Sequence, residues 1–229
     1  VYPDSFIVWK LLVVSLMALG QKTKALSAFK RVVEINPQYA DGFNNMGEAL
    51  RNLGKHELAL KTFSRAVLLR PEYSEAYVNI GNVYNDLEEY KKAITAFETA
   101  LKIKPNIVNA YFGAGIAFSA LGRMGEALEN YEKAIAIKPD SYKALLNLGI
   151  ALRKTERLSE AEDALAKAIK LFPEGPLAFN ELGIVYKQQS KTEKAVENYR
   201  QAIVLDENFA EAHFNFGICV ADKGRHAEA

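Results

Sequence analysis

Apolar residues recur along the chain at three- and four-residue intervals, in stretches separated by short polar breaks. One pair of stretches shows the pattern: Tyr77, Ile80, Gly81 and Tyr84, followed by Ala93, Phe97, Ala100 and Leu101. This spacing is typical of amphipathic helices that bury one face. The break within a pair is often Leu-Gly, as at Leu53-Gly54. The pattern therefore predicts pairs of helices, named here helix A and helix B.

The helix pairs recur with a strict period of 34 residues. Prolines mark it at Pro37, Pro71, Pro105, Pro139 and Pro173. Glycines follow at Gly47, Gly81, Gly115, Gly149, Gly183 and Gly217. Alanines follow at Ala25, Ala59, Ala93, Ala127, Ala161, Ala195 and Ala229. The small residues allow close approach of two helices, an aromatic residue or Leu fills the space beside them, and the proline ends helix B.

This order of residues within 34 positions resembles the tetratricopeptide repeat (TPR). The predicted units are 6–39, 40–73, 74–107, 108–141, 142–175 and 176–209, with a partial seventh at 210–229. The resemblance implies an all-α, right-handed superhelical solenoid of antiparallel helix pairs, in which helices A line a concave groove. One unit cannot bury its apolar face alone, so residues 6–229 are expected to form a single solenoid after a lead-in at 1–5. The first unit departs from the pattern at Val13, and Glu207 takes the place of the last proline.

Composition narrows the class of partner. The chain has 229 residues, of which 49% are hydrophobic and 25% charged, with a net charge of +1. Near-neutral charge argues against nucleic-acid binding. The most apolar run, residues 7–19, is interrupted by Lys10 and Ser15 and falls short of the roughly 18 residues that a membrane span needs. We predict a cytoplasmic, bacterial-type protein. We also predict that the sequence is a fragment of a longer chain, because it starts without Met and stops in mid-pattern.

No constellation of residues predicts catalysis. The histidines, His56, His213 and His226, do not combine with other metal ligands at helical spacing in a recognisable motif. His213 occupies an aromatic column and Cys219 a small-residue column, so both are expected to pack in the core. Phosphate loops, dinucleotide fingerprints and nucleophile elbows are absent from the sequence. We therefore expect a chain that is not an enzyme and takes no metal or cofactor.

The concave face is where the resemblance places a ligand, at the second, fifth, sixth, ninth, twelfth and thirteenth positions of each unit. The sixth position contains Asn45, Asn79, Asn147 and Asn215, and other positions add Asn44, Asn82, Asn85 and Asn180. One hypothesis is that these amides bind an extended peptide backbone, similar to the asparagine ladder in the repeat region of O-linked N-acetylglucosamine transferases. The alternative is that Asn is simply the habitual residue of the repeat here and bonds locally.

The charge of this face changes along the chain, from acidic in units two and three to basic and apolar in units five and six. A partner segment with a basic end and an acidic, apolar end would match it, and accidental asymmetry of a solvated surface is the alternative. The chaperone-binding carboxylate clamp is excluded, because its Lys and Arg positions hold Glu75 and Asn79. The candidate peptide-binding residues are Asn44, Asn45, Glu48, Asn79, Asn82, Phe112, Ile116, Lys143, Leu146, Asn147, Ile150, Asn180, Ile184 and Lys187.

The leading hypothesis is a protein-interaction scaffold that holds an extended segment of a protein or peptide partner. The alternative is the substrate-recruiting part of a larger glycosyltransferase or sulfotransferase, because residues 2–9 resemble the entry to such arrays. The reading frame beyond Ala229 would separate the two. A third hypothesis is a self-assembling scaffold. The apolar first unit (Ile7, Leu11, Val14, Met17 and Ala18) is expected either to pack against a preceding segment or to mediate self-association, and the last helix (Phe216, Val220) is a second candidate for self-association.

Overall fold

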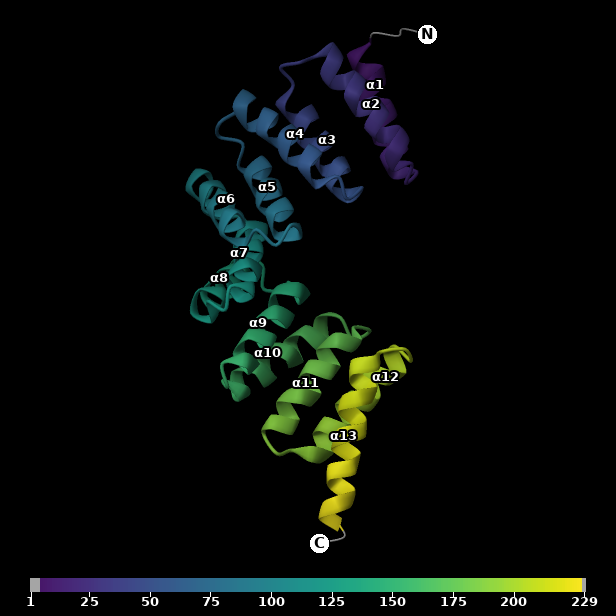
Figure 1. The fold of residues 1–229 in the computed structure, drawn as a ribbon, viewed down its shortest axis with the longest axis vertical. Helices are drawn as coiled ribbons and strands as arrows, with labels where there is room; N and C mark the ends of the chain where they lie inside the picture. The colour runs from purple at the N-terminus through teal and green to yellow at the C-terminus, as the bar shows by residue number, and fades with distance from the viewer. Residues whose placement is uncertain (1–4, 228–229) are drawn as a thin grey trace. The chain divides into compact units, whose positions relative to one another are not determined.

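The computed structural model describes residues 5–227, and the side chains of residues 5–222. Over this range the chain forms thirteen α-helices and no strand (Figure 1). Helices A are α1 (Phe6–Ala18), α3 (Ala40–Asn52), α5 (Ser74–Asp86), α7 (Val108–Ala120), α9 (Tyr142–Lys154), α11 (Pro176–Gln188) and α13 (Ala210–Ala227). Helices B are α2 (Lys22–Ile35), α4 (His56–Leu69), α6 (Tyr90–Ile103), α8 (Met124–Ile137), α10 (Leu158–Leu171) and α12 (Thr192–Leu205).

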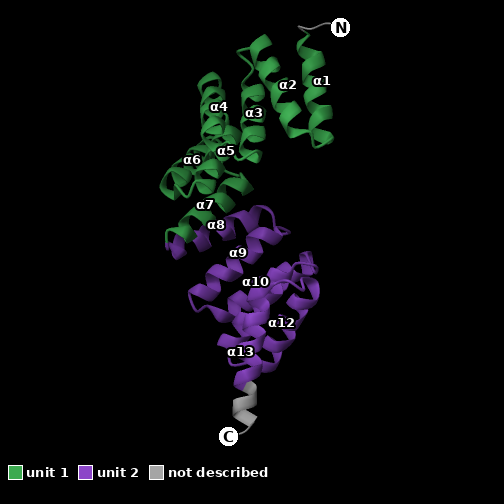
Figure 2. Ribbon diagram, turned by 45° about the vertical axis from the view of Figure 1, so that its right-hand side comes forward, with its two compact units in different colours: residues 1–121 green, residues 122–229 purple. Residues whose placement is uncertain are grey.

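Each helix A begins at the first residue predicted for its unit, so the all-α fold of repeated helix pairs is confirmed. Most of the predicted lead-in, residue Ala229 and the side chain of His226 lie outside the described residues. The chain divides into two compact units, Val1–Leu121 and Gly122–Ala229 (Figure 2). The boundary falls in the turn between helices A and B of the fourth repeat. A single cooperative solenoid stays a prediction.

In the first compact unit, consecutive helices pack against one another from α1 to α7. The glycine column makes this packing close. A Cβ atom on Gly47 would lie 2.6 Å from Cε1 of Phe63, a ring that is fully buried. A Cβ atom on Gly81 of the same repeat, or on Gly113 of the next repeat, would likewise overlap the Phe97 ring. The aromatic side chain of helix B thus fills the space that the glycines of helix A leave open.

The second compact unit uses the same contact with other side chains. Gly149 faces Leu165, and Gly183 faces the buried ring of Tyr199. Cys219 is buried as predicted, and it packs with Tyr199 and Phe216. His213 corrects a prediction, because it is exposed and its Nε2 lies 2.9 Å from the carbonyl oxygen of Glu207.

In each of the six full repeats, one residue of the turn between helices A and B adopts the left-handed backbone conformation, with a positive φ. Gly20, Gly54 and Gly122 take this conformation, with φ of 67°, 71° and 73°. In the other full repeats the same position holds Glu88, Glu156 and Ser190, with φ of 59°, 60° and 61°. Side chains with a Cβ atom adopt this conformation at a cost. The repeat geometry therefore overrides local preference in half of the turns.

The end of helix B is set by an extended residue before the proline position. Arg70, which precedes Pro71, has φ −138° and ψ 90°. Asp206, which precedes Glu207, has φ −144° and ψ 98°. Helix α12 therefore ends in register with the other helices B although the proline is replaced.

Candidate peptide-binding surface

Helices α3, α5 and α7 carry the candidate residues of the first compact unit. Asn45 and Glu48 are exposed on α3, whereas Asn79 and Asn82 on α5 are half-buried. Phe112 and Ile116 on α7 are half-buried as well. These side chains are partly or fully open to solvent, so a partner can reach them.

In the second compact unit, Lys143, Asn147 and Ile150 lie on α9, and Ile184 and Lys187 on α11. Lys143 is exposed and the other four are half-buried. All five therefore remain accessible to a partner.

The fifth position of helix A requires a correction. Asn44, Leu146 and Asn180 are buried, with exposed fractions of 7%, 6% and 0%. For Asn44 and Asn180 the structure shows the reason directly, because each accepts a hydrogen bond from helix A of the next repeat. These residues join neighbouring repeats and do not line an open surface.

The asparagines form amide pairs between repeats. Nδ2 of Asn79 donates to Oδ1 of Asn44 at 3.0 Å, and Nδ2 of Asn215 donates to Oδ1 of Asn180 at 3.1 Å. In both pairs a sixth-position residue donates to the fifth-position residue of the preceding repeat. Neither sequence-based alternative anticipated this arrangement. The recurrence of amides at both positions was its signal in the sequence.

Other members of the column behave differently. Nδ2 of Asn147 donates to the carbonyl oxygen of Lys143 at 2.9 Å, within its own helix. This is the local bond that the alternative hypothesis expected. Asn85, in the twelfth position, donates to the carbonyl oxygen of Gly113 in the next repeat at 2.9 Å. The asparagines therefore serve local and inter-repeat bonding, and among the four sixth-position asparagines, whose side chains are all described, Asn45 is the exposed one.

Glu181 replaces asparagine in the sixth position and forms an inter-repeat ion pair. Nε of Arg153 donates to Oε2 of Glu181 at 2.9 Å, and the Glu181 side chain is 8% exposed. Burial raises the pKa of Glu181, and the Arg153 charge opposes that rise. A buried pair of this kind is costly to break by removing one partner.

Most charges predicted to give the surface its asymmetry are neutralised within the chain. Arg51 binds Asp86 through two hydrogen bonds of 2.6 and 3.1 Å. Arg70 binds Asp41 through two hydrogen bonds of 3.0 and 3.1 Å. The pair of Arg51 and Asp86 had a signal in the sequence. The two opposite charges lie 35 residues apart, at the twelfth position of one unit and the thirteenth position of the next.

Glu75 and Lys187, two further charges of this face, form ion pairs at longer distances. The Lys104 ammonium lies 3.9 Å from Glu75, and the Lys187 ammonium 3.5 Å from Asp222.

The uncompensated charges of this face are fewer than predicted. Glu48 in the first compact unit, and Lys143 and Lys154 in the second, are exposed and form no ion pair with a described residue. Lys143, Asn147, Ile150 and Lys154 recur every three or four residues along α9, so they share one face, named here the α9 stripe. This stripe combines two ammonium groups, an amide and an apolar side chain.

The described residues contain neither a membrane-spanning helix nor a cluster of metal ligands. None of the helices there is both long enough and apolar enough to cross a membrane. No group of three or more His, Cys, Asp or Glu side chains in that range is placed to hold a metal ion. Burial raises the pKa of the Cys219 thiol.

Family models described as tetratricopeptide repeat match residues 9–39, 38–106, 72–140 and 112–176, and a model described as TPR repeat matches 185–224. The chain therefore belongs to the tetratricopeptide repeat family. A search of the curated proteins gives no significant match. The resemblance to the repeats of O-linked N-acetylglucosamine transferases is not tested by these comparisons and stays a prediction.

Several solved structures are similar. YrrB, described as a TPR protein with an unusual peptide-binding site, is 27% identical, with a TM-score of 0.68 over 82% of this chain and 96% of its own. MamA is 25% identical, with a TM-score of 0.62 over 69% of this chain and 92% of its own. Pseudomonas aeruginosa PilF is 15% identical, with a TM-score of 0.80 over 91% and 95%, so it shows the fold alone.

Proposed function

We propose that this chain is a protein-interaction scaffold that binds an extended partner segment on its helix-A face. The observation that carries the proposal is the α9 stripe. Lys143 and Lys154 lack an ion-pair partner among the described residues, although most other charges of the face have one. Unpaired ammonium groups beside the half-buried Ile150 suit a segment that contains acidic and apolar residues.

The family supports the general part of this proposal. YrrB, a TPR protein, is described as having a peptide-binding site. Stacked repeats also present one helix face many times, which suits an extended ligand. On α3 the corresponding face carries the unpaired Glu48 beside Asn45, so it suits a basic segment.

Peptide selection tests the proposal. A random library of displayed peptides is panned on the chain, and selected peptides are measured by fluorescence anisotropy against the wild type and Lys143→Glu/Lys154→Glu. We expect enrichment of peptides with acidic and apolar residues, and a loss of about tenfold or more in affinity in the variant.

The matched control is Lys138→Glu/Lys167→Glu, which makes the same charge change at exposed positions outside helices A. Its affinity should stay within about twofold of the wild type, because distant exposed charges are screened. Equal losses in both variants, or a library that yields no binding peptide, would overturn the proposal.

A further inference from the structure

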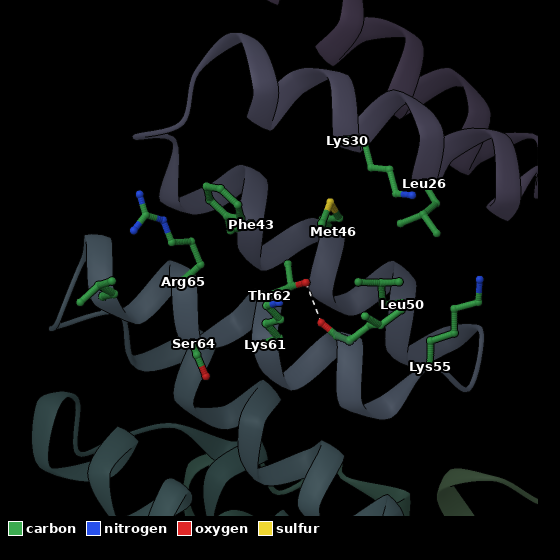
Figure 3. Close-up of a pocket in the computed structure, with 12 residues that line it drawn as sticks. Leu26, Lys30, Phe43, Met46, Leu50, Lys55, Lys61, Thr62, Ser64 and Arg65 are labelled. Carbon is green, nitrogen blue, oxygen red and sulfur yellow. Dashed lines mark hydrogen bonds between the residues drawn. The ribbon is translucent and has the colours of Figure 1, made fainter.

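A groove on the helix-B side of the first compact unit, named here the first groove, lies away from the candidate peptide-binding residues (Figure 3). Its volume is about 610 Å³. Helix α3 supplies the floor through Phe43, Met46 and Leu50, and helices α2 and α4 supply the two walls. The α4 wall includes Leu58 and Leu68, whose exposed fractions are 53% and 69%. Large apolar side chains beside a groove are a feature of sites that bind another molecule.

The rim of this groove is basic. Lys30 lies on α2, and Lys55, Lys61 and Arg65 lie at or along α4, whereas no Asp or Glu lines the groove. None of these four cations forms an ion pair with a described residue. The Arg65 guanidinium lies 6.0 Å from the centre of the Phe43 ring, so it borders the apolar floor.

The second compact unit contains the corresponding groove four repeats later, between α10 and α12 over α11. Its volume is about 490 Å³, and its floor consists of Phe179, Leu182 and Tyr186, which are 136 residues (four times 34) after Phe43, Met46 and Leu50. The concave shape and the apolar floor are therefore shared properties of the repeat.

The rims of the two grooves differ. Lys30, Lys61 and Arg65 of the first groove correspond to Ala166, Glu197 and Gln201 of the second. The floor stays apolar in both, but these three cations are replaced by neutral and acidic side chains. Lys170 is the one cation that lines the second groove, where Glu197 opposes its charge, so the excess of positive charge distinguishes the first groove from the second.

We propose that the groove between α2 and α4 binds an acidic amphipathic helix of a partner protein. Charge complementarity identifies the occupant, because four unpaired cations border an apolar floor that has no acidic side chain. The lining residues of α4 recur every three or four residues from Lys55 to Leu68, over about 20 Å of helix. A partner helix of about four turns matches this length and would place apolar side chains on the floor and carboxylates at the rim.

The probe is a fluorescein-labelled 14-residue amphipathic peptide with Leu and Phe on one face and Glu on the flanks. One control peptide has Gln in place of Glu, and another has Ser in place of Leu and Phe. We expect the first peptide to bind and both controls to bind at least about tenfold more weakly. Equal binding of the Gln peptide would overturn the proposal, because the rim charges would then make no difference.

Variants locate the binding. Lys61→Glu/Arg65→Gln gives the first groove the side chains that α12 already carries, so the fold should be kept, which circular dichroism checks. We expect this variant to lose about tenfold or more in affinity. Lys91→Glu/Lys102→Gln makes the same charge change at exposed sites outside the groove and should bind like the wild type. Equal losses in both variants would overturn the assignment to this groove.

The reverse graft, Ala166→Lys/Glu197→Lys/Gln201→Arg, gives the second groove a basic rim. In the Lys61→Glu/Arg65→Gln background we expect it to restore peptide binding.

Two further measurements separate this proposal from its rivals. The α9 stripe variant Lys143→Glu/Lys154→Glu is measured with the same peptide, because the stripe is itself proposed to bind acidic and apolar segments. If that variant alone loses binding, the peptide occupies the helix-A face and the present inference is wrong. Binding to phosphatidylserine vesicles that depends on Lys61 and Arg65, without peptide binding, would overturn it in favour of a membrane surface.

Discussion

The amide of Asn79 donates a hydrogen bond of 3.0 Å to the buried amide oxygen of Asn44, and so joins two successive helices A. Asn215 and Asn180 repeat this pair in the second compact unit. A residue type that helices tolerate poorly is therefore used in a contact between repeats. The asparagines that suggested a ligand site also hold the repeats in register.

Replacing Asn79 with Ala should lower the free energy of unfolding by about 1–3 kcal/mol, because the buried oxygen of Asn44 loses its donor. Asn147→Ala is the matched control. Its amide is half-buried and bonds only within its own helix, so the change should stay within about 0.5 kcal/mol. Urea denaturation measures both. Equal losses would show that the amide pair is not the stabilising feature.

Gly149→Ala and Gly125→Ala should have opposite effects. A Cβ atom at Gly149 would lie 2.6 Å from Cγ of the buried Leu165, so we expect a loss of about 1–3 kcal/mol from overpacking. A Cβ atom at Gly125 meets nothing within 4 Å, and the site is helical. Alanine should therefore stabilise that variant by about 0.5–1 kcal/mol. Thermal unfolding would contradict this account if both variants shifted in the same direction.

Glu156→Gly should raise stability although it introduces glycine. Glu156 has φ 60°, a conformation that costs a residue with a Cβ atom roughly 1–2 kcal/mol. Glycine carries an entropic penalty of about 0.5–1 kcal/mol, so the expected gain is about 0.5–1 kcal/mol. The reverse change, Gly54→Ala, should lower stability, since Gly54 has φ 71°. Differential scanning calorimetry compares the two, and a fall in Tm for Glu156→Gly would refute the strain argument.

The sequence predicted the helices more successfully than the surface. Gly81 and Phe97 recur at fixed positions because their contact is rebuilt in each repeat, so periodicity alone identifies it. The start of every helix A followed from this register. The left-handed Glu88 did not, because no feature of that residue favours the conformation and the neighbouring repeats impose it.

The candidate surface was harder to predict, since exposure depends on which neighbour faces each side chain. A helical wheel places Asn44 near the open face, but helix A of the next repeat covers it. Likewise, Arg51 and Asp86 contribute to the charge count of the sequence, yet they neutralise each other across the repeat boundary. Contacts between repeats, which a helical wheel does not represent, decided both outcomes.

The ion pair of Asp41 and Arg70 should make stability depend on acidity. The hydrogen bonds from Arg70 hold the pKa of Asp41 below its ordinary value of 3.8. The pair therefore stabilises the fold above that pH, and its contribution disappears as the pH falls through the lowered pKa. Asp41→Asn should cost about 0.2–1 kcal/mol at pH 7, the range for a surface pair.

The same substitution should cost progressively less as the solution becomes more acidic. Urea denaturation at pH 7, 4 and 3 measures the trend. Glu48→Gln is the control, since Glu48 forms no ion pair with a described residue and its small effect should not follow the same curve. A cost for Asp41→Asn that does not change with pH would contradict the assignment of the pair.

Self-association should depend on helix α1. Ile7, Leu11 and Val14 have exposed fractions of 69%, 63% and 66%, and their spacing places them on one face. We expect dimers whose population rises with protein concentration, because contact between two such faces removes apolar surface from water.

Leu11→Glu should shift the equilibrium towards the monomer without unfolding the chain, since the side chain is already exposed. Phe214→Glu, at a residue of α13 that is 68% exposed, is the comparison. Sedimentation equilibrium distinguishes the outcomes: loss of dimer in Phe214→Glu alone would assign the interface to α13, and a wild-type monomer at all concentrations would exclude both.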